Sequence, residues 1–159
     1  MNDPLTEIAP QRSSSIKQIV VAVYLSPRSE ATARYAVEIA RAFGASIVLV
    51  HVHAAIEVNE FMTEEDYRAL DRQRQAAQVA LTKLTQTLQA EYPACEERFL
   101  IGEPAEQVAS LAHELNADLI IAGSHRPGLL VRLFNLEQAP QIVHRAPCSV
   151  LVYHPKEDR

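Results

Sequence analysis

Short runs of apolar residues alternate along the chain with longer segments in which apolar residues recur every three or four positions. The runs have the length of β-strands and are apolar at nearly every step, which is typical of strands that are covered on both faces. The segment 95–101 is half polar, which favours a place at the edge of a sheet. The predicted strands are 16–23, 45–52, 95–101, 118–122 and 148–153.

The periodic segments between these runs predict helices. The first helix ends at Phe43, before Gly44. The second begins at Thr63, which with Asp66 comes close to a capping-box pattern, and it ends before Pro93. A third begins at 102–104 with proline in its first turn, and a short fourth is predicted at 138–145. The stripes expected to face the core are Ala36, Ile39, Ala40 and Phe43 in the first helix, Tyr67, Leu70, Ala77, Leu81, Leu84 and Leu88 in the second, and Val108, Leu111, Ala112 and Leu115 in the third.

The alternation of strands and helices predicts an α/β fold, a doubly wound parallel sheet with helices on both faces and right-handed crossovers. The expected organisation is a flexible N-terminal leader at 1–15, one α/β domain at 16–154 and a polar tail at 155–159. In such a sheet, ligands bind at the carboxyl ends of the strands where the strand order reverses. A site is therefore expected in the loops after Val23, Val52 and Ala122.

Composition narrows the class of protein. A length of 159 residues fits one domain, and a net charge of −5 without any run of Lys or Arg disfavours nucleic acid as a partner. No apolar run has the length of a membrane span, and the first residues do not resemble a signal peptide. Cys95 and Cys148 are expected to be buried free thiols. These features predict a cytoplasmic protein with no membrane association.

The loop that follows the fourth predicted strand has the most residues that could bind a ligand. They are Gly123, Ser124, His125, Arg126 and Gly128. Small residues let backbone N–H groups approach a phosphate, and the two basic side chains can add positive charge. Glycine also serves simply to turn the chain in such loops. The spacing alone therefore leaves a phosphate site and an ordinary turn both open.

Several catalytic and metal sites are disfavoured by the sequence. It contains no Walker A loop, no dinucleotide-binding glycine fingerprint and no nucleophile elbow. Ser124 stands beside His125 without a third group to orient them, so no catalytic residue is assigned. His51 and His53 share one side of a strand but lack a further ligand, so no metal is predicted.

Taken together, residues 17–153 resemble the universal stress protein family. The segments on which the resemblance rests are IVVAV at 19–23, IVLVHV at 47–52, GEP at 102–104, ADLIIAGSH at 117–125 and IVHRAPCSVLV at 142–152. The resemblance implies a five-stranded sheet in the order 3-2-1-4-5. It also implies a homodimer built on the last strand, 148–153, where a partner chain would cover an apolar sheet edge.

Family members that bind ATP or AMP carry Asp at the end of the first strand. They also carry a Gly-x-x-Gly loop that is followed nine residues on by Gly-Ser or Gly-Thr. Here Gly123 is kept, but Tyr24, Arg126 and the pair Leu136 and Glu137 occupy the other positions. Bulky side chains block the approach of phosphate to the backbone, and the carboxylate of Glu137 repels it. These departures predict the loss of ordinary ATP binding.

The leading interpretation is a non-enzymatic regulatory or interaction protein of the stress response, homodimeric and without a required cofactor. The alternative is a sensor that binds AMP, ATP or a cyclic nucleotide at the ends of the first and fourth strands. In that case Tyr24 would stack on the adenine, while Arg126 and His125 would hold a phosphate. The residues assigned to this site are Val23, Tyr24, Gly123, Ser124, His125, Arg126, Gly128, Glu137 and Gln138.

Overall fold

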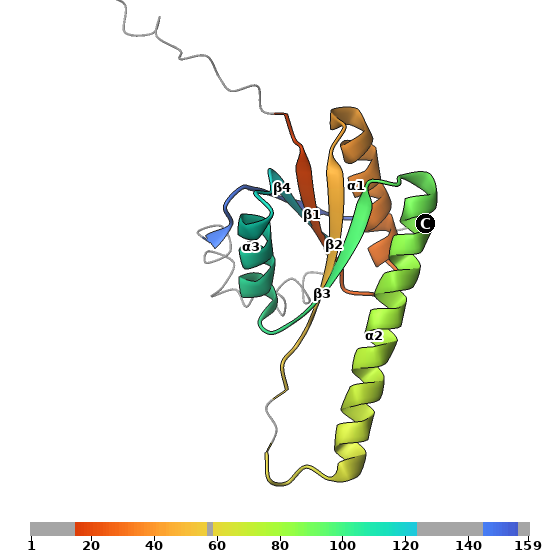
Figure 1. Cartoon of the computed structure of the whole chain (residues 1–159), viewed down its shortest axis with the longest axis vertical. Helices are drawn as coiled ribbons and strands as arrows, with labels where there is room; N and C mark the ends of the chain where they lie inside the picture. The colour runs from red at the N-terminus through yellow and green to blue at the C-terminus, as the bar shows by residue number, and fades with distance from the viewer. Residues whose placement is uncertain (1–14, 57–58, 124–144, 156–159) are drawn as a thin grey trace, which may run out of the picture.

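A parallel five-stranded sheet in the order β3-β2-β1-β4-β5 forms the centre of the molecule (Figure 1). The computed structural model describes residues 15–56, 59–123 and 145–155. The predicted fold class and strand order are confirmed, including the edge position of β3. The strands are β1 (Gln18–Ala22), β2 (Ser46–His53), β3 (Cys95–Ile101), β4 (Leu119–Gly123) and β5 (Ser149–Tyr153).

Helices cover both faces of the sheet. They are α1 (Ser29–Phe43), α2 (Glu64–Glu91) and α3 (Pro104–Glu114). The core beside α1 and α2 is built on alternate β1 residues such as Ile19 and Val21, and the core beside α3 is built on Val20 and its neighbours (Figure 1). The helix predicted at 138–145 lies, up to residue 144, outside the described residues.

The helix ends follow the signals in the sequence. The Thr63 hydroxyl accepts the N–H of Asp66 at 3.2 Å, and the Asp66 carboxylate accepts the N–H of Thr63 at 2.8 Å, so the capping box is complete. Gly44 ends α1 with φ 67, a left-handed conformation that glycine adopts without strain. Pro104 stands in the first turn of α3, as predicted.

The prediction of one buried stripe along the whole of α2 is wrong for its first half. Leu81 and Leu88 are fully buried, whereas Tyr67 is 42 % exposed. The cause is length, because 28 helical residues span about 42 Å while the seven residues of β3 span about 23 Å. The first half of α2 therefore extends past the sheet (Figure 1).

Three side-chain hydrogen bonds fix the second half of α2. The Thr82 hydroxyl donates to Glu97 Oε1 at 2.7 Å, and the Gln89 amide donates to the Cys95 carbonyl at 2.7 Å. Just past the helix, the Tyr92 hydroxyl donates to the Ala45 carbonyl at 2.5 Å. These bonds anchor the helix to β3 and to the start of β2.

Two smaller burial predictions also need correction. Phe43 ends the stripe of α1 but is exposed, because it lies in the last turn, beyond the edge of the core. Cys95 is buried as expected, while Cys148 is only half-buried. Cys148 precedes β5 at the edge of the sheet, where fewer elements cover it.

Candidate functional site

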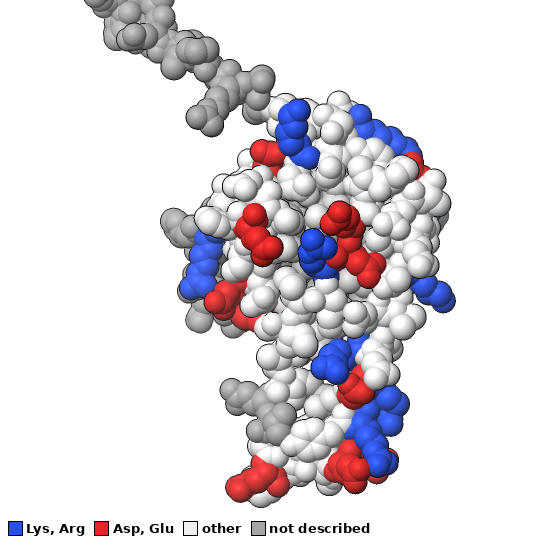
Figure 2. Space-filling model, in the orientation of Figure 1, with Lys and Arg blue, Asp and Glu red and all other residues white. Residues whose placement is uncertain are grey.

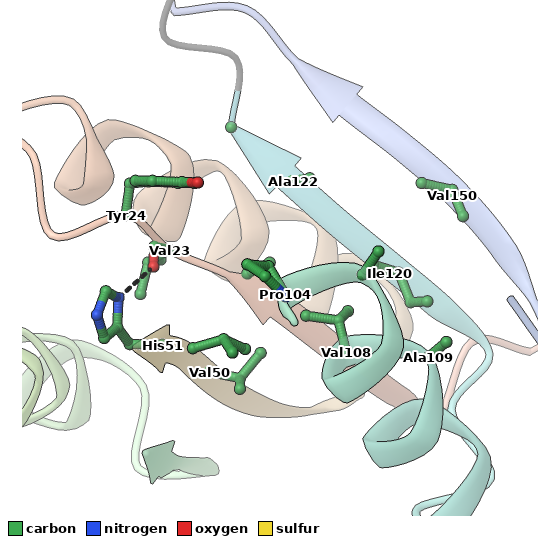
Figure 3. A pocket seen from close by; sticks show the side chains of 14 residues that line it. Val23, Tyr24, Val50, His51, Pro104, Val108, Ala109, Ile120, Ala122 and Val150 are labelled. Atoms are coloured by element: carbon green, nitrogen blue, oxygen red, sulfur yellow. Dashed lines mark hydrogen bonds between the residues drawn. The ribbon is translucent and has the colours of Figure 1, made fainter. Parts of the chain in front are cut away.

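The carboxyl ends of β1, β2 and β4 meet at one edge of the sheet, as the order of the elements predicts. Parallel pairing places Ala22 beside Val50 on one side and beside Ala122 on the other. A pocket opens between this edge and α3 (Figure 3). Most of its walls are small or apolar side chains, among them Ala22, Val50, Pro104, Val108, Ile120 and Ala122.

The enclosed part of this pocket is small. It holds about 50 Å³, whereas an apolar cavity that accepts benzene measures about 150 Å³. The described walls therefore cannot enclose a whole purine ring. Such a ring has to lie at the mouth, or the side chains at the mouth have to move.

Tyr24 stands at that mouth, directly after β1 (Figure 3). Its side chain is 39 % exposed. Burial of the rest, together with the nearby carboxylate of Glu103, raises the pKa of Tyr24 to about 12, so the phenol keeps its proton at neutral pH. The site thus presents an aromatic face and a hydroxyl that can donate a hydrogen bond.

A second, polar hollow lies on the other side of Tyr24. It is lined by Ser26 and Arg28 just before α1 and by Ser29 and Thr32 in its first turn, and it shares Tyr24 and Gly123 with the apolar pocket. Tyr24 therefore separates an apolar compartment beside α3 from a polar one beside α1. That arrangement suits a ligand with an apolar ring and a polar end.

Leu25, the next residue, adopts φ 58. This left-handed conformation is uncommon for a branched side chain and costs roughly 1–3 kcal/mol. The Leu25 side chain packs against the main core cluster, which compensates for the strain. The sharp change of direction lets the chain leave β1 and enter α1 while Tyr24 stays at the pocket, a feature with no signal in the sequence.

The start of α3 offers little to a phosphate. Pro104 has no N–H, and the Glu103 carboxylate already accepts the N–H of Glu106 at 2.7 Å. A free helix N-terminus attracts anions, but this one is occupied by a carboxylate of its own chain. The wall beside α3 therefore favours the uncharged part of a ligand.

Gly123 ends β4 between the two compartments and has a packing role that the sequence does not reveal. A Cβ atom at this position would lie 2.4 Å from Thr32 Oγ1, far inside the contact distance. With Thr32 in this rotamer, only glycine lets β4 lie this close to α1. This requirement is independent of any phosphate.

Three of the residues assigned from the sequence come together in the structure. Val23, Tyr24 and Gly123 line both compartments. The other assigned residues lie outside the part of the chain that the structure describes, and so does Leu136. These assigned residues are Ser124, His125, Arg126, Gly128, Glu137 and Gln138.

The two histidines of β2 lie beside Phe99. The ring centroids of His51 and His53 are 6.3 Å apart, and those of His51 and Phe99 are 5.6 Å apart. His51 Nδ1 lies 3.0 Å from the Val23 carbonyl oxygen, which can only accept, so this nitrogen carries a hydrogen and donates a hydrogen bond to that oxygen (Figure 3). Across residues 15–56, 59–123 and 145–155, no group of three or more His, Cys, Asp or Glu side chains is arranged to hold a metal ion.

His51 predicts a pH dependence of stability. Burial lowers its pKa below 6.5, and the neighbouring His53 adds to the effect. In the window between that lowered pKa and 6.5 the unfolded chain binds more protons than the folded one, so stability falls as pH decreases through it. Urea unfolding should show that the free energy of unfolding falls more between about pH 7.5 and about pH 5.5 in the wild type than in His51→Gln. Equal losses in the two proteins would contradict this assignment.

None of the helices in the described parts of the chain is both long enough and apolar enough to span a membrane.

Comparison with known proteins shows which family this chain resembles. The model of the universal stress protein family matches residues 15–154. Among characterised sequences, the protein called universal stress protein A homolog 1 of Coxiella burnetii is 33% identical over 144 residues, covering 89% of this chain and 98% of its own.

Solved structures show the same fold. A universal stress protein from Archaeoglobus fulgidus, determined in complex with dAMP, is 25% identical and aligns with a TM-score of 0.57 over 87% of this chain and 98% of its own. A universal stress protein in complex with cAMP is 23% identical and aligns with a TM-score of 0.62 over 88% of this chain and 98% of its own.

Proposed function

The chain belongs to the universal stress protein family, and from this premise we propose that it is a non-enzymatic regulatory protein whose pocket at the ends of β1 and β4 binds a nucleoside monophosphate in preference to ATP. The stress response and the cytoplasm are its proposed setting.

The observation that carries the proposal is Tyr24 at the mouth of the apolar pocket. The pocket lies where parallel sheets bind ligands, and its walls accept a base edge but not a charged group. An exposed tyrosine ring at such a mouth can stack on the base. The Archaeoglobus relative in complex with dAMP supports a ligand of this size and charge.

The same surroundings disfavour a long phosphate chain. Tyr24 stands where ATP-binding members of the family carry Asp, and the Glu103 carboxylate lies near it. Each added phosphate adds negative charge in the field of that carboxylate, which weakens binding. A monophosphate can direct its single charged group toward the polar compartment beside α1.

The absence of catalysis is part of the proposal. Among the described lining residues of the apolar pocket, only Tyr24 and His51 carry polar side-chain atoms. The Nδ1 atom of His51 is engaged by the Val23 carbonyl, and the raised pKa of Tyr24 keeps its phenol protonated at neutral pH, so that it offers no base. Binding without turnover is what these groups support.

A homodimer through β5 is also proposed. This five-residue strand lies at the edge of the sheet, and Val152 is exposed on it. An apolar edge strand is a template for pairing with another chain. The two-fold pairing of β5 with a second β5 would cover this edge.

Substitutions at Tyr24 test the proposed site. Tyr24→Ala removes a stacking surface worth roughly 1–3 kcal/mol per base, so AMP affinity should fall about 5- to 150-fold in isothermal calorimetry. Tyr24→Phe keeps the ring and should retain most of the affinity. Tyr67→Ala, which removes an exposed tyrosine on α2, is the matched control and should bind AMP like the wild type. Equal affinities of Tyr24→Ala and the wild type would refute a base at this mouth.

A further inference from the structure

The depth of the apolar pocket at the ends of β1, β2 and β4 has room for a substituent but not for a ring. Its enclosed volume is about 50 Å³. A cavity of about 150 Å³ holds the six carbon atoms of benzene, so in proportion this depth holds about two non-hydrogen atoms. A base that lies at the mouth can therefore place one small group inside.

Apolar side chains from the sheet and from α3 form the walls of this depth. Val50, Val108, Ile120 and Val150 line it, and all four belong to the core cluster on the α3 face or pack against it. Figure 3 shows Val50 and Ile120 beside Val108 of α3. A group that enters the pocket thus meets hydrocarbon on its described sides.

The backbone of these walls is already paired. Val50 lies between β1 and β3, and Ile120 lies between β1 and β5, each paired with a residue on both sides. Val108 lies within α3. Strands that are paired on both sides and helix interiors satisfy their own N–H and C=O groups. An N–H group placed among these described walls would therefore stay unpaired.

His51 also lines the pocket, but its imidazole lies on the other face of the sheet. Successive strand residues point to opposite faces, and Val50 and Val52 pack on the α3 face. The ring of His51 instead lies 5.6 Å, between centroids, from that of Phe99, which packs against the cluster beside α1 and α2. Its Nδ1 atom donates to the Val23 carbonyl. The depth therefore receives no hydrogen-bonding side chain from β2.

The position of the phosphate determines which edge of a purine faces the depth. This step rests on the proposed function, in which Tyr24 stacks on the base and the phosphate lies in the polar compartment beside α1. Tyr24 separates the two compartments, so the sugar leaves on one side and the base enters on the other. The edge of adenine opposite the sugar carries N1, C6 and the exocyclic N6. N6 is then the group nearest the depth.

Unmodified adenine fits this depth poorly. Its N6 amino group carries two N–H donors, and a buried donor without a partner costs binding free energy. A methyl group on N6 replaces one donor by hydrocarbon, and the remaining N–H turns toward the mouth, where water accepts it. The nitrogen and its methyl carbon together match the number of atoms that the depth holds.

We propose that this pocket binds the monophosphate of N6-methyladenosine in preference to AMP. The methyl group fills the enclosed volume of about 50 Å³, while the ring stays against Tyr24 at the mouth. Burial of one methyl group raises affinity about fourfold. Hydrocarbon alone distinguishes this ligand from AMP, without a new hydrogen bond.

Isothermal calorimetry of the full chain with AMP and with N6-methyl-AMP tests this preference. The two ligands differ by one methyl group, and N6-methyl-AMP should bind at least about fourfold more tightly. Binding of AMP with equal or weaker binding of N6-methyl-AMP would overturn this inference and leave the proposed function standing. Binding of neither ligand at millimolar concentration would overturn both.

A variant that fills the depth shows where the methyl group lies. Ala109 lines the pocket and is 7 % exposed, and Ala109→Val adds hydrocarbon at that wall. This variant should bind the two ligands with equal affinity. If the preference of about fourfold persisted in Ala109→Val, the methyl group would lie outside the pocket and the proposal would be wrong.

Ala76→Val is the matched control. Ala76 is exposed on α2, and Figure 2 shows charged side chains of both signs over the projecting part of this helix, as on a solvated surface. The control introduces the same side chain into a helix without touching the pocket, so it should keep the preference of the wild type. An equal loss of preference in both variants would refute the assignment to this pocket. If Ala109→Val fails to fold, the comparison of the two ligands on the wild type still decides.

Discussion

Replacing Ile121 by alanine is expected to lower the free energy of unfolding by about 2–5 kcal/mol. Ile121 is 0 % exposed and belongs to the larger core cluster, beneath α1. It pairs with Val21 of β1 and Leu151 of β5, so it is covered by strands on both sides. Truncation removes buried apolar surface and leaves a cavity that such a sheet cannot close.

Urea unfolding followed by circular dichroism measures this loss. Val79→Ala is the control, because Val79 lies exposed on the outer side of α2 and its truncation should change stability by less than about 0.5 kcal/mol. A similar small change for Ile121→Ala would mean that β4 is not packed as the structure describes. The site would then lose its support, since Ala122 and Gly123 follow directly.

Gly123→Ala is the second large effect, with an expected loss of roughly 1–3 kcal/mol of stability. The new Cβ would collide with Thr32 Oγ1 at 2.4 Å, and Thr32 is buried, so the Thr32 side chain must rotate or β4 and α1 must move apart. Both compartments of the site share Gly123. Nucleotide affinity should therefore fall together with stability.

The double variant Gly123→Ala/Thr32→Ala separates this collision from other roles of the glycine. Removal of the Thr32 hydroxyl and methyl should return most of the lost stability, a coupling of about 0.5–3 kcal/mol. Thr32→Val keeps a β-branched side chain of the same shape and should return little. Absence of coupling between positions 123 and 32 would show that the close approach of β4 and α1 is not what glycine is needed for.

Local patterns predicted the sheet well because a strand or a cap is decided by a few neighbouring residues. The β-branched run in β1 predicted a strand covered on both faces, and its residues Ile19, Val20 and Val21 are all fully buried. Thr63 and Asp66 fixed the start of α2 by their own hydrogen bonds. These features require no knowledge of the rest of the fold.

Features that depend on where other elements end could not be predicted in this way. The stripe of α2 looks uniform in the sequence, but the sheet beneath it stops near Leu81. The same limit applies to Phe43, whose exposure depends on where the core ends. A periodic stripe shows that a face is apolar, not which element covers it.

The sequence predicts where in the fold the candidate site should lie, but not its detail. The carboxyl ends of β1, β2 and β4 meet because parallel strands end at one edge, which strand order alone implies. The left-handed Leu25, the Thr32 collision at Gly123 and the carboxylate cap at the start of α3 are three-dimensional relations with no local signature. Together they determine the shape and charge of the pocket.

Isothermal calorimetry of the purified full chain with AMP, and separately with ATP and Mg²⁺, tests the central claim most directly. The account predicts saturable binding of AMP that is at least tenfold tighter than that of ATP, because Tyr24 borders the mouth of the pocket and the Glu103 carboxylate lies near Tyr24. Binding of ATP as tight as that of AMP, or no binding of AMP at millimolar concentration, would contradict it.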